Sequence, residues 1–199
     1  ARLIKSNEEI VCLKHAIAVA QIGMQNMRDA LQPGMTENQL WSWLHQANIA
    51  HNGEWIETRL LSSGPRTNPW MQESSDRIIQ AGELVAFDTD MIGPNGYCAD
   101  ISRTYLCGDQ RADDEQRHLY QTAYEQIQHN ISILRAGRTL HDVVSSEWAF
   151  PDEFLAYRYG LAHGVGLKDE FPFLVNAPDI DALSDPQMTL EVGMVLSVE

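Results

Sequence analysis

The sequence predicts an α+β fold in which helices pack on one face of a curved antiparallel sheet. Apolar residues recur at helical spacing through residues 10–27. Short apolar runs separated by Gly, Pro and Asn follow, and then further helical segments and a second set of short runs. Helices and strands therefore come in blocks, which is the order typical of an α+β domain.

Two helices are expected first. Pro33-Gly34 ends the first helix, and Thr36-Glu37 begins a second one that reaches about Ala50. The later expected elements are a strand over 55–61, strand-like runs over 84–91 and 97–107, helices over 113–134 and 140–148, and a final apolar run over 194–198. The turn sequence Gly93-Pro94-Asn95-Gly96 favours a hairpin between the two longer strand-like runs.

We expect residues 1–199 to form one domain. A chain of 199 residues can bury a substantial core. The chain does not begin with Met, and it stops at Glu199 directly after an apolar run, where a finished domain rarely ends. The sequence therefore predicts a fragment that is truncated at its C-terminus.

The composition excludes several classes of protein. The chain has 28 acidic residues against 14 basic ones and a net charge of −14, whereas nucleic-acid binding needs clustered Lys and Arg. No apolar run approaches the roughly 20 residues that span a bilayer, and the N-terminal stretch lacks the apolar core of a signal peptide. Cys12, Cys98 and Cys107 form neither an even disulfide framework nor a CxxC pair. We therefore expect a cytoplasmic protein with no nucleic-acid or membrane partner.

Three aspartates at the hairpin are the strongest metal-ligand candidates. Asp88 and Asp90 lie two residues apart, so a strand would project both to one face, and the hairpin returns Asp100 towards them. Three adjacent carboxylates repel one another unless a cation or protons lie between them. Hard or borderline divalent metals bind such oxygen clusters. The alternative is an exposed acidic turn, which the apolar residues on either side of the cluster disfavour.

His163 and Glu199 extend the predicted ligand set. A lone His is more often structural than a ligand, but glycines in the His163-Gly164-Val165-Gly166 sequence allow close backbone approach. Glu199 closes an apolar run, where a carboxylate is costly to bury unless it is paired or bound to metal. Together with the aspartates, these residues predict a pair of metal ions.

At these residues the chain resembles the metallopeptidase superfamily of methionine aminopeptidases, proline-specific aminopeptidases, prolidases and creatinase. The resemblance covers nearly the whole chain and is most specific at residues 96–104 and 163–167. It implies the pita-bread fold and two metals held by two Asp, one His and two Glu. Asp100, His163 and Glu199 match ligand positions. The resemblance places the second Glu beyond residue 199 and implies an N-terminal domain that this chain lacks.

Three departures from the peptidase pattern point to another reaction. The hairpin is one residue longer, so Asp88 and Asp90 flank the usual ligand spacing and both are candidates. Trp70 and Asp169 stand where the peptidases carry histidines that polarise the scissile amide. These features resemble the branch of the superfamily that cleaves dimethylsulfoniopropionate, the DddP type. The resemblance implies a lyase with Asp169 as general base in a β-elimination that releases dimethyl sulfide and leaves acrylate.

An aromatic face would stabilise the sulfonium of that substrate by about 0.5–2 kcal/mol. Trp70, Tyr157 and Tyr159 are the candidates, of which Trp70 and Tyr159 are our predicted substrate-binding residues. The alternatives are a loop anchor for Trp70 and ordinary core packing for the two tyrosines. For Asp169, the alternative is a solvated turn acid.

Two other functions stay open. The first is a metallo-aminopeptidase or Xaa-Pro peptidase of the prolidase kind that hydrolyses N-terminal peptide bonds, and the second is a binding protein that kept the fold without the chemistry. The retained acidic ligand candidates disfavour the second. For the lyase, the resemblance implies two divalent metal ions, with iron first and manganese, cobalt or zinc open. It also implies a small zwitterionic substrate and a homodimer of the full-length protein.

Overall fold

The computed structural model describes residues 2–199 and divides them into two compact units. One unit comprises Asn7–Gln116, and the other comprises residues 2–6 together with Arg117–Glu199. Each unit has its own cluster of buried apolar residues. The prediction of one catalytic domain over the whole chain stays a prediction, and the two units are described separately.

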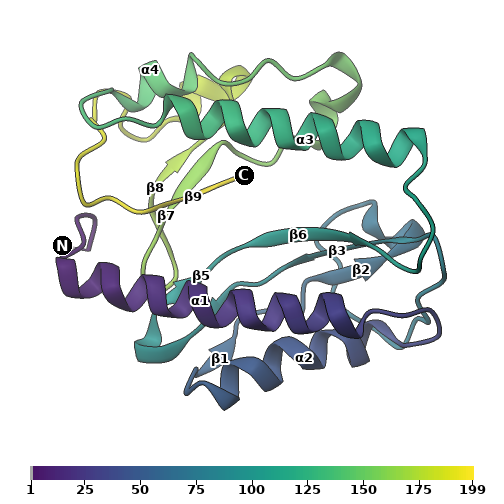
Figure 1. The fold of residues 1–199 in the computed structure, drawn as a ribbon. Helices are drawn as coiled ribbons and strands as arrows, with labels where there is room; N and C mark the ends of the chain where they lie inside the picture. Colours follow the sequence, from purple (N-terminus) through teal and green to yellow (C-terminus); the bar gives the residue numbers. More distant parts are fainter. Residues whose placement is uncertain (1) are drawn as a thin grey trace. The chain divides into compact units, whose positions relative to one another are not determined.

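The Asn7–Gln116 unit contains two long helices and six short strands (Figure 1). The helices are α1 (Asn7–Ala30) and α2 (Glu37–Ala50). The strands are β1 (Trp55–Ile56), β2 (Leu61–Ser63), β3 (Leu84–Asp88), β4 (Met91–Ile92), β5 (Cys98–Ala99) and β6 (Ser102–Leu106). Two short 3-10 helices, η1 (Gly64–Thr67) and η2 (Pro94–Gly96), lie in the loops.

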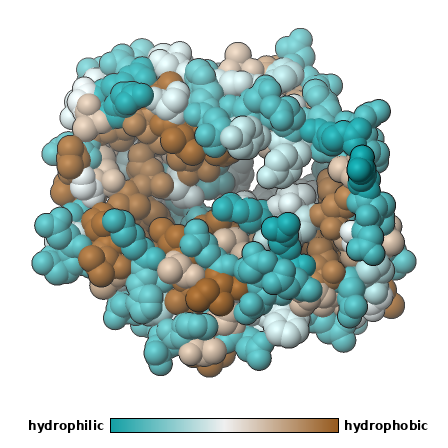
Figure 2. All heavy atoms as spheres, viewed as in Figure 1, coloured by the Kyte–Doolittle hydropathy of each residue, from teal (hydrophilic) through white to brown (hydrophobic). Residues whose placement is uncertain are grey.

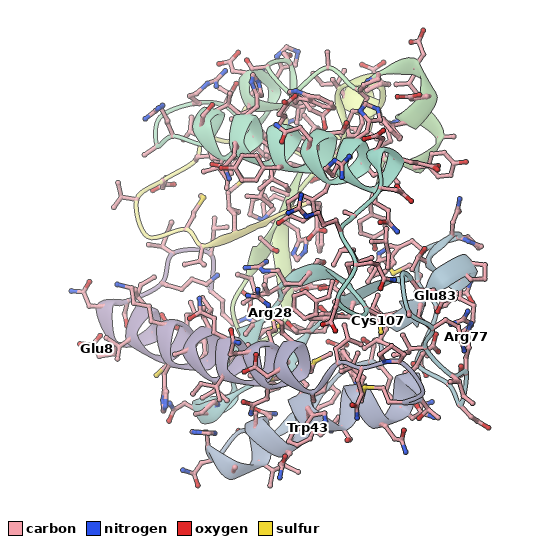
Figure 3. The ribbon with its side chains drawn as sticks, turned by 45° about the vertical axis from the view of Figure 1, so that its right-hand side comes forward. Glu8, Arg28, Trp43, Arg77, Glu83 and Cys107 are labelled. Carbon is pink, nitrogen blue, oxygen red and sulfur yellow. The ribbon has the colours of Figure 1, made fainter. Side chains whose placement is uncertain are left out.

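Helices α1 and α2 pack side by side and share one core with the strands (Figure 1). Residues of α1 at helical spacing, among them Ala16, Ala20 and Met27, are buried in this core. Glu8 in the first turn of α1 and Arg28 in its last turn complement the helix dipole at opposite ends (Figure 3). Thr36 begins α2 with a capping box, because its hydroxyl accepts from the Gln39 N–H and its own N–H donates to the Gln39 side chain.

The strands of this unit form two antiparallel sheets with the orders β1-β4-β5 and β2-β3-β6. The predicted hairpin is present, with β4 paired to β5 across η2. The predicted strand over 55–61 is interrupted between β1 and β2, and the runs over 84–91 and 97–107 are interrupted between β3 and β4 and between β5 and β6. Backbone hydrogen bonds from Glu57 N to Asp90 O (3.2 Å) and from Asp88 N to Leu60 O (2.9 Å) cross the interruption. The two sheets are therefore the two ends of one bent sheet.

The other unit contains one long helix and a third antiparallel sheet with the order β8-β7-β9 (Figure 1). Its elements are α3 (Asp114–Ile133), α4 (Leu140–Val144), η3 (Asp152–Tyr157), β7 (Ala162–Val165), β8 (Asp169–Leu174), η4 (Ala177–Ala182) and β9 (Leu196–Val198). The first residues of α3 belong to the preceding unit. Helix α4 ends earlier than predicted, where Ser146 donates from its hydroxyl to the Asp142 carbonyl and Arg138 donates to the same oxygen.

The surface mixes polar and apolar residues. Figure 2 shows hydrophilic residues over much of the face in view, with apolar residues exposed between them. Large apolar side chains exposed on α3 are Leu119, Tyr120, Tyr124 and Ile131. Within residues 2–199, no helix combines the length and the apolar character that crossing a bilayer requires.

A fully buried carboxylate organises the loop between β2 and β3. The Glu37 side chain accepts hydrogen bonds from the N–H and hydroxyl groups of Ser63 and Ser75 at 2.7–3.1 Å. It also pairs with Arg66, which donates to the Glu73 carbonyl at 2.9 Å. A buried carboxylate surrounded by donors in this way joins the start of α2 to both ends of the loop that carries Trp70.

We predict that Glu37→Gln lowers the free energy of unfolding by about 3 kcal/mol, because the amide nitrogen would face donors and leave Arg66 unpaired. The midpoint of urea unfolding measures the change. Glu73→Gln removes the exposed ion pair with Arg59 and should change stability by about 0.5 kcal/mol or less. Equal effects of the two substitutions would contradict the role of the network.

Arg77 and Glu83 form a second ion pair near Cys107 (Figure 3). The Arg77 guanidinium donates to both carboxylate oxygens of Glu83, at 2.8 and 2.5 Å. This hydrogen bonding lowers the pKa of Glu83 and raises that of Arg77. Burial, with a smaller effect of the Glu83 charge, raises the pKa of the Cys107 thiol.

The lowered pKa of Glu83 predicts acid sensitivity. A carboxyl whose pKa is lower in the folded state stabilises the fold above its ordinary pKa, and this stabilisation is lost as the pH falls through the folded-state value. Glu83→Gln should therefore destabilise the fold at pH 7, by about 1 kcal/mol or less for a partly exposed pair, and should have less effect near pH 3. Urea unfolding at both pH values tests this expectation. An equal loss at both would contradict it.

Candidate metal centre

Asp88, Asp90 and Asp100 lie together at the interruption of the bent sheet. One carboxylate oxygen from each lies within 4.8 Å of the others. Asp88 pairs with Ser102 at the end of one ladder, and Met91 pairs with Ala99 at the start of the next. Asp90 lies between Asp88 and Met91, and Asp100 lies between Ala99 and Ser102, so both occupy the gap between the two ladders.

Thr89 joins the two strands across this gap. Its buried hydroxyl donates to the Ala99 carbonyl at 2.5 Å and accepts from the Ile101 N–H at 3.1 Å. Asp90 has a positive φ of 36°, in the left-handed region that Asp adopts more readily than most residues. The predicted proximity of the three carboxylates is therefore observed, but it results from a break in the strand and not from the regular alternation of a continuous one.

The donor set fits a divalent cation. Asp88 is buried, and Asp90 and Asp100 are only partly exposed, which disfavours the alternative of a solvated acidic turn. Three carboxylates this close repel one another strongly when all are charged, and a hard cation relieves that repulsion. Their role as metal ligands stays a prediction.

In the other unit, His163 on β7 lies beside Glu199 at the end of β9. His163 Nε2 is 3.4 Å from a carboxylate oxygen of Glu199, and Nδ1 is 3.0 Å from the Gly164 carbonyl oxygen. A carbonyl only accepts, so Nδ1 is the nitrogen that donates in this contact, while Nε2 faces the Glu199 carboxylate. A neutral imidazole oriented by a backbone carbonyl is the usual arrangement of a metal-binding His.

Asp169, at the start of β8, lies next to the same imidazole. One of its carboxylate oxygens is 3.8 Å from His163 Nδ1, and its side chain is about half exposed. Asp169 pairs with Val165 on β7. The short turn between β7 and β8 therefore keeps Asp169, the predicted base, close to His163, the predicted ligand. The structure thus brings His163, Glu199 and Asp169 together within one unit.

The two glycines that follow His163 allow β8 to approach closely. A side chain at Gly164 would place its Cβ 2.5 Å from the Phe171 carbonyl oxygen, and one at Gly166 would meet the Glu170 carboxylate at 2.8 Å. The register between β7 and β8 shifts at Gly164, so that two residues of β8 bulge out of the ladder. Glycine at position 164 is therefore a requirement of strand packing, because a side chain there would meet backbone atoms.

A buried ion pair stabilises the turn between β7 and β8. The Glu170 carboxylate accepts from the Leu167 N–H at 3.2 Å and pairs with the buried ammonium of Lys5 at 3.1 Å. Lys5 in turn donates from its backbone N–H to the Gly193 carbonyl at 2.8 Å. Nothing in the sequence indicates that Lys5 lies beside the site, because only the fold brings residues 165 positions apart into contact.

The aromatic candidates lie in different surroundings. Trp70 is partly buried in the loop that the Glu37 network anchors. Tyr157 and Tyr159 are 66% and 71% exposed, so the alternative of core packing for these two tyrosines is wrong. They lie at the end of η3 and in the residues after it, on the surface of their unit. Substrate binding by Trp70 and Tyr159 stays a prediction.

Known proteins resemble this chain over all or nearly all of its length. The model of metallopeptidase family M24 matches residues 11–199. Two proteins named dimethylsulfoniopropionate lyase DddP are similar to the whole chain, with 44% identity for the one from Roseovarius nubinhibens and 41% for the one from Roseobacter denitrificans. The chain covers 46% of each, and so spans about half the length of these relatives.

The prolidase structure from Pyrococcus furiosus matches 99% of the chain with a TM-score of 0.83 and 25% identity, over 57% of that protein. The predicted fold class is therefore confirmed: mixed helices and antiparallel sheets of the pita-bread type.

We predict that Gly164→Ala destabilises the fold by about 2 kcal/mol, because backbone atoms must move to admit the new methyl group. Gly160→Ala is the matched control, since its Cβ would lie at an ordinary 3.5 Å from the Leu174 carbonyl oxygen. Thermal and urea unfolding of both variants measure the difference. The requirement for glycine would be refuted if both variants were as stable as the wild type.

Proposed function

Because the chain belongs to metallopeptidase family M24, we propose that it is the catalytic part of a metal-dependent lyase that cleaves dimethylsulfoniopropionate to dimethyl sulfide and acrylate. The observation that carries the proposal is the Asp169 carboxylate, 3.8 Å from His163, at a position where the peptidases of the superfamily carry a second histidine. The 44% identity to a relative named for this reaction supports it.

The metal ligands that we propose are those predicted from the sequence, namely Asp88, Asp90, Asp100, His163 and Glu199. Carboxylate oxygens and an imidazole nitrogen suit two divalent ions of the kind on which this family depends. When bound, the metals neutralise negative charge that develops on the substrate carboxylate. We propose iron on the basis of the family resemblance, while manganese, cobalt and zinc suit the same donors.

Asp169 would act as the general base. It takes the proton from the carbon next to the substrate carboxylate, and the released electron pair forms the new carbon–carbon double bond. The bond between carbon and sulfur breaks, and its electron pair leaves with dimethyl sulfide. The zwitterionic substrate and the Asp169 anion thus become a neutral sulfide, an acrylate anion and a protonated Asp169, so charge and atoms balance.

Peptide hydrolysis is the alternative, favoured by the likeness to the Pyrococcus furiosus prolidase. Trp70 and Asp169 replace the two histidines that would polarise a scissile amide. Loss of one such donor removes about 2–4 kcal/mol of transition-state stabilisation. A carboxylate at position 169 offers no N–H group to polarise an amide, but it can accept a proton. The substitutions therefore favour elimination over hydrolysis.

We further propose a cytoplasmic homodimer with a small zwitterionic substrate. Cys12, Cys98 and Cys107 are free thiols, and burial of the last two is consistent with a reducing compartment. The homodimer follows from the family resemblance, and size-exclusion chromatography of the full-length protein tests it. Trp70 and Tyr159 keep their proposed roles at the sulfonium end of the substrate.

We predict that Asp169→Asn in the full-length, metal-loaded enzyme lowers dimethyl sulfide release by about 10²–10⁴-fold, because an amide cannot take the proton. Gas chromatography of the headspace over dimethylsulfoniopropionate measures the product. Asp181→Asn, the same change at an exposed position, should leave the rate unchanged.

Two outcomes would overturn the proposal. A folded, metal-loaded wild-type enzyme that releases no dimethyl sulfide and hydrolyses Xaa-Pro dipeptides would be a peptidase. An Asp169→Asn variant that kept full lyase activity would exclude Asp169 as the base.

A further inference from the structure

Strand β8 presents an aromatic ring to the predicted metal ligand His163. Phe173 is 55% exposed and pairs directly with His163 across the β7–β8 ladder. The two rings lie 6.0 Å apart between centroids and are inclined by 30°. An exposed phenylalanine thus lies against an imidazole whose neighbours include the carboxylates of Glu199 and Asp169.

The bulge in β8 brings this ring and the proposed base to the same imidazole. Asp169 and Phe173 are four residues apart, which corresponds to about 13 Å along a regular strand. Phe171 and Pro172 have no partners in the ladder, since the pairing passes from Gly164 with Glu170 directly to His163 with Phe173. Both ends of this bulged segment therefore contact His163, and a substrate held beside the imidazole would lie within reach of both.

The chemistry of the ring selects which end of a substrate it can bind. Phenylalanine has no hydrogen-bond donor, so it cannot hold a carboxylate. Its face attracts cations, most effectively soft, weakly hydrated ones within about 6 Å of the centroid. In dimethylsulfoniopropionate the sulfur is three single bonds from the carboxylate carbon, or about 4 Å away. A carboxylate bound near His163 would therefore place the sulfonium within range of Phe173.

We propose that Phe173 binds the sulfonium end of the substrate and is a specificity-determining residue that selects cationic over neutral carboxylates. The inference rests on the proposed lyase function and deepens it by adding Phe173 to Trp70 and Tyr159, the residues already proposed to bind the sulfonium. It also adds a residue that the sequence did not indicate. The chain has many aromatic residues, and only the bulge in β8 brings Phe173 beside His163.

A pair of substrate analogues tests the assignment without turnover. The analogues 3-(trimethylammonio)propionate and 4,4-dimethylpentanoate have the same carboxylate and nearly the same shape, but only the first is cationic at the far end. Their dissociation constants are measured by calorimetry on the full-length, metal-loaded enzyme. The variants are Phe173→Leu, Phe173→Trp and, as the matched control on the same strand, Phe171→Leu.

Phe173→Leu should weaken binding of the cationic analogue about three- to thirtyfold and leave binding of the neutral analogue within about twofold. Phe173→Trp should keep the preference for the cation, and Phe171→Leu should bind both analogues like the wild type. For dimethylsulfoniopropionate itself, KM should rise in Phe173→Leu more than kcat falls.

Equal weakening of both analogues by Phe173→Leu would overturn the proposal and assign the ring to packing, and so would unchanged binding of both. If Phe173→Leu failed to fold, loss of the cation preference in the folded Phe173→Trp variant would overturn it. Failure of the lyase function has a different signature: the wild type would release no dimethyl sulfide, whatever the analogues show.

Discussion

Mutual repulsion among carboxylates is the constraint on which the rest of the aspartate site depends. The fold holds three of them within 4.8 Å of one another, although each gains by moving away from the others. The backbone segments that carry them are held together, because ladders pair the strands on both sides and the Thr89 hydroxyl joins the two strands between the ladders. The aspartates thus lie at a break in the sheet, and the hydrogen bonds of Thr89 hold the two strands together at that break. The result is a preorganised cluster of oxygen donors.

The second unit uses a different device to the same end. Strand β8 approaches β7 closely at Gly164, where any side chain would meet the backbone of Glu170 and Phe171. The close approach permits a bulge, and the bulge lets residues from both ends of β8 face one histidine. Lys5 and Glu170 form a buried ion pair that stabilises the turn between β7 and β8, and the Glu170 carboxylate also accepts a hydrogen bond from the backbone of that turn. Stability and chemical arrangement here depend on the same few residues.

The change from hydrolysis to elimination that we propose requires little alteration of such a scaffold. A proton acceptor in place of a proton donor changes what can be done to a substrate whose carboxylate is held by metal. The leaving group needs no protonation, since a sulfonium departs as a neutral sulfide. An acidic, aromatic surrounding therefore suits this substrate better than the histidine-rich surrounding of a peptidase.

The sequence by itself determined the fold class, the long helices, the hairpin and the proximity of the three aspartates. These features follow from local periodicity, turn chemistry and motif spacing, which depend only on residues that are close together in the sequence. It did not determine the break in the strands, the exposure of Tyr157 and Tyr159 or the neighbours of His163. Phe173 reaches the site through a bulge, and Lys5 reaches it through a contact across 165 positions. Only the tertiary structure decided these, because they depend on which backbones approach closely, and that is a property of the packed chain.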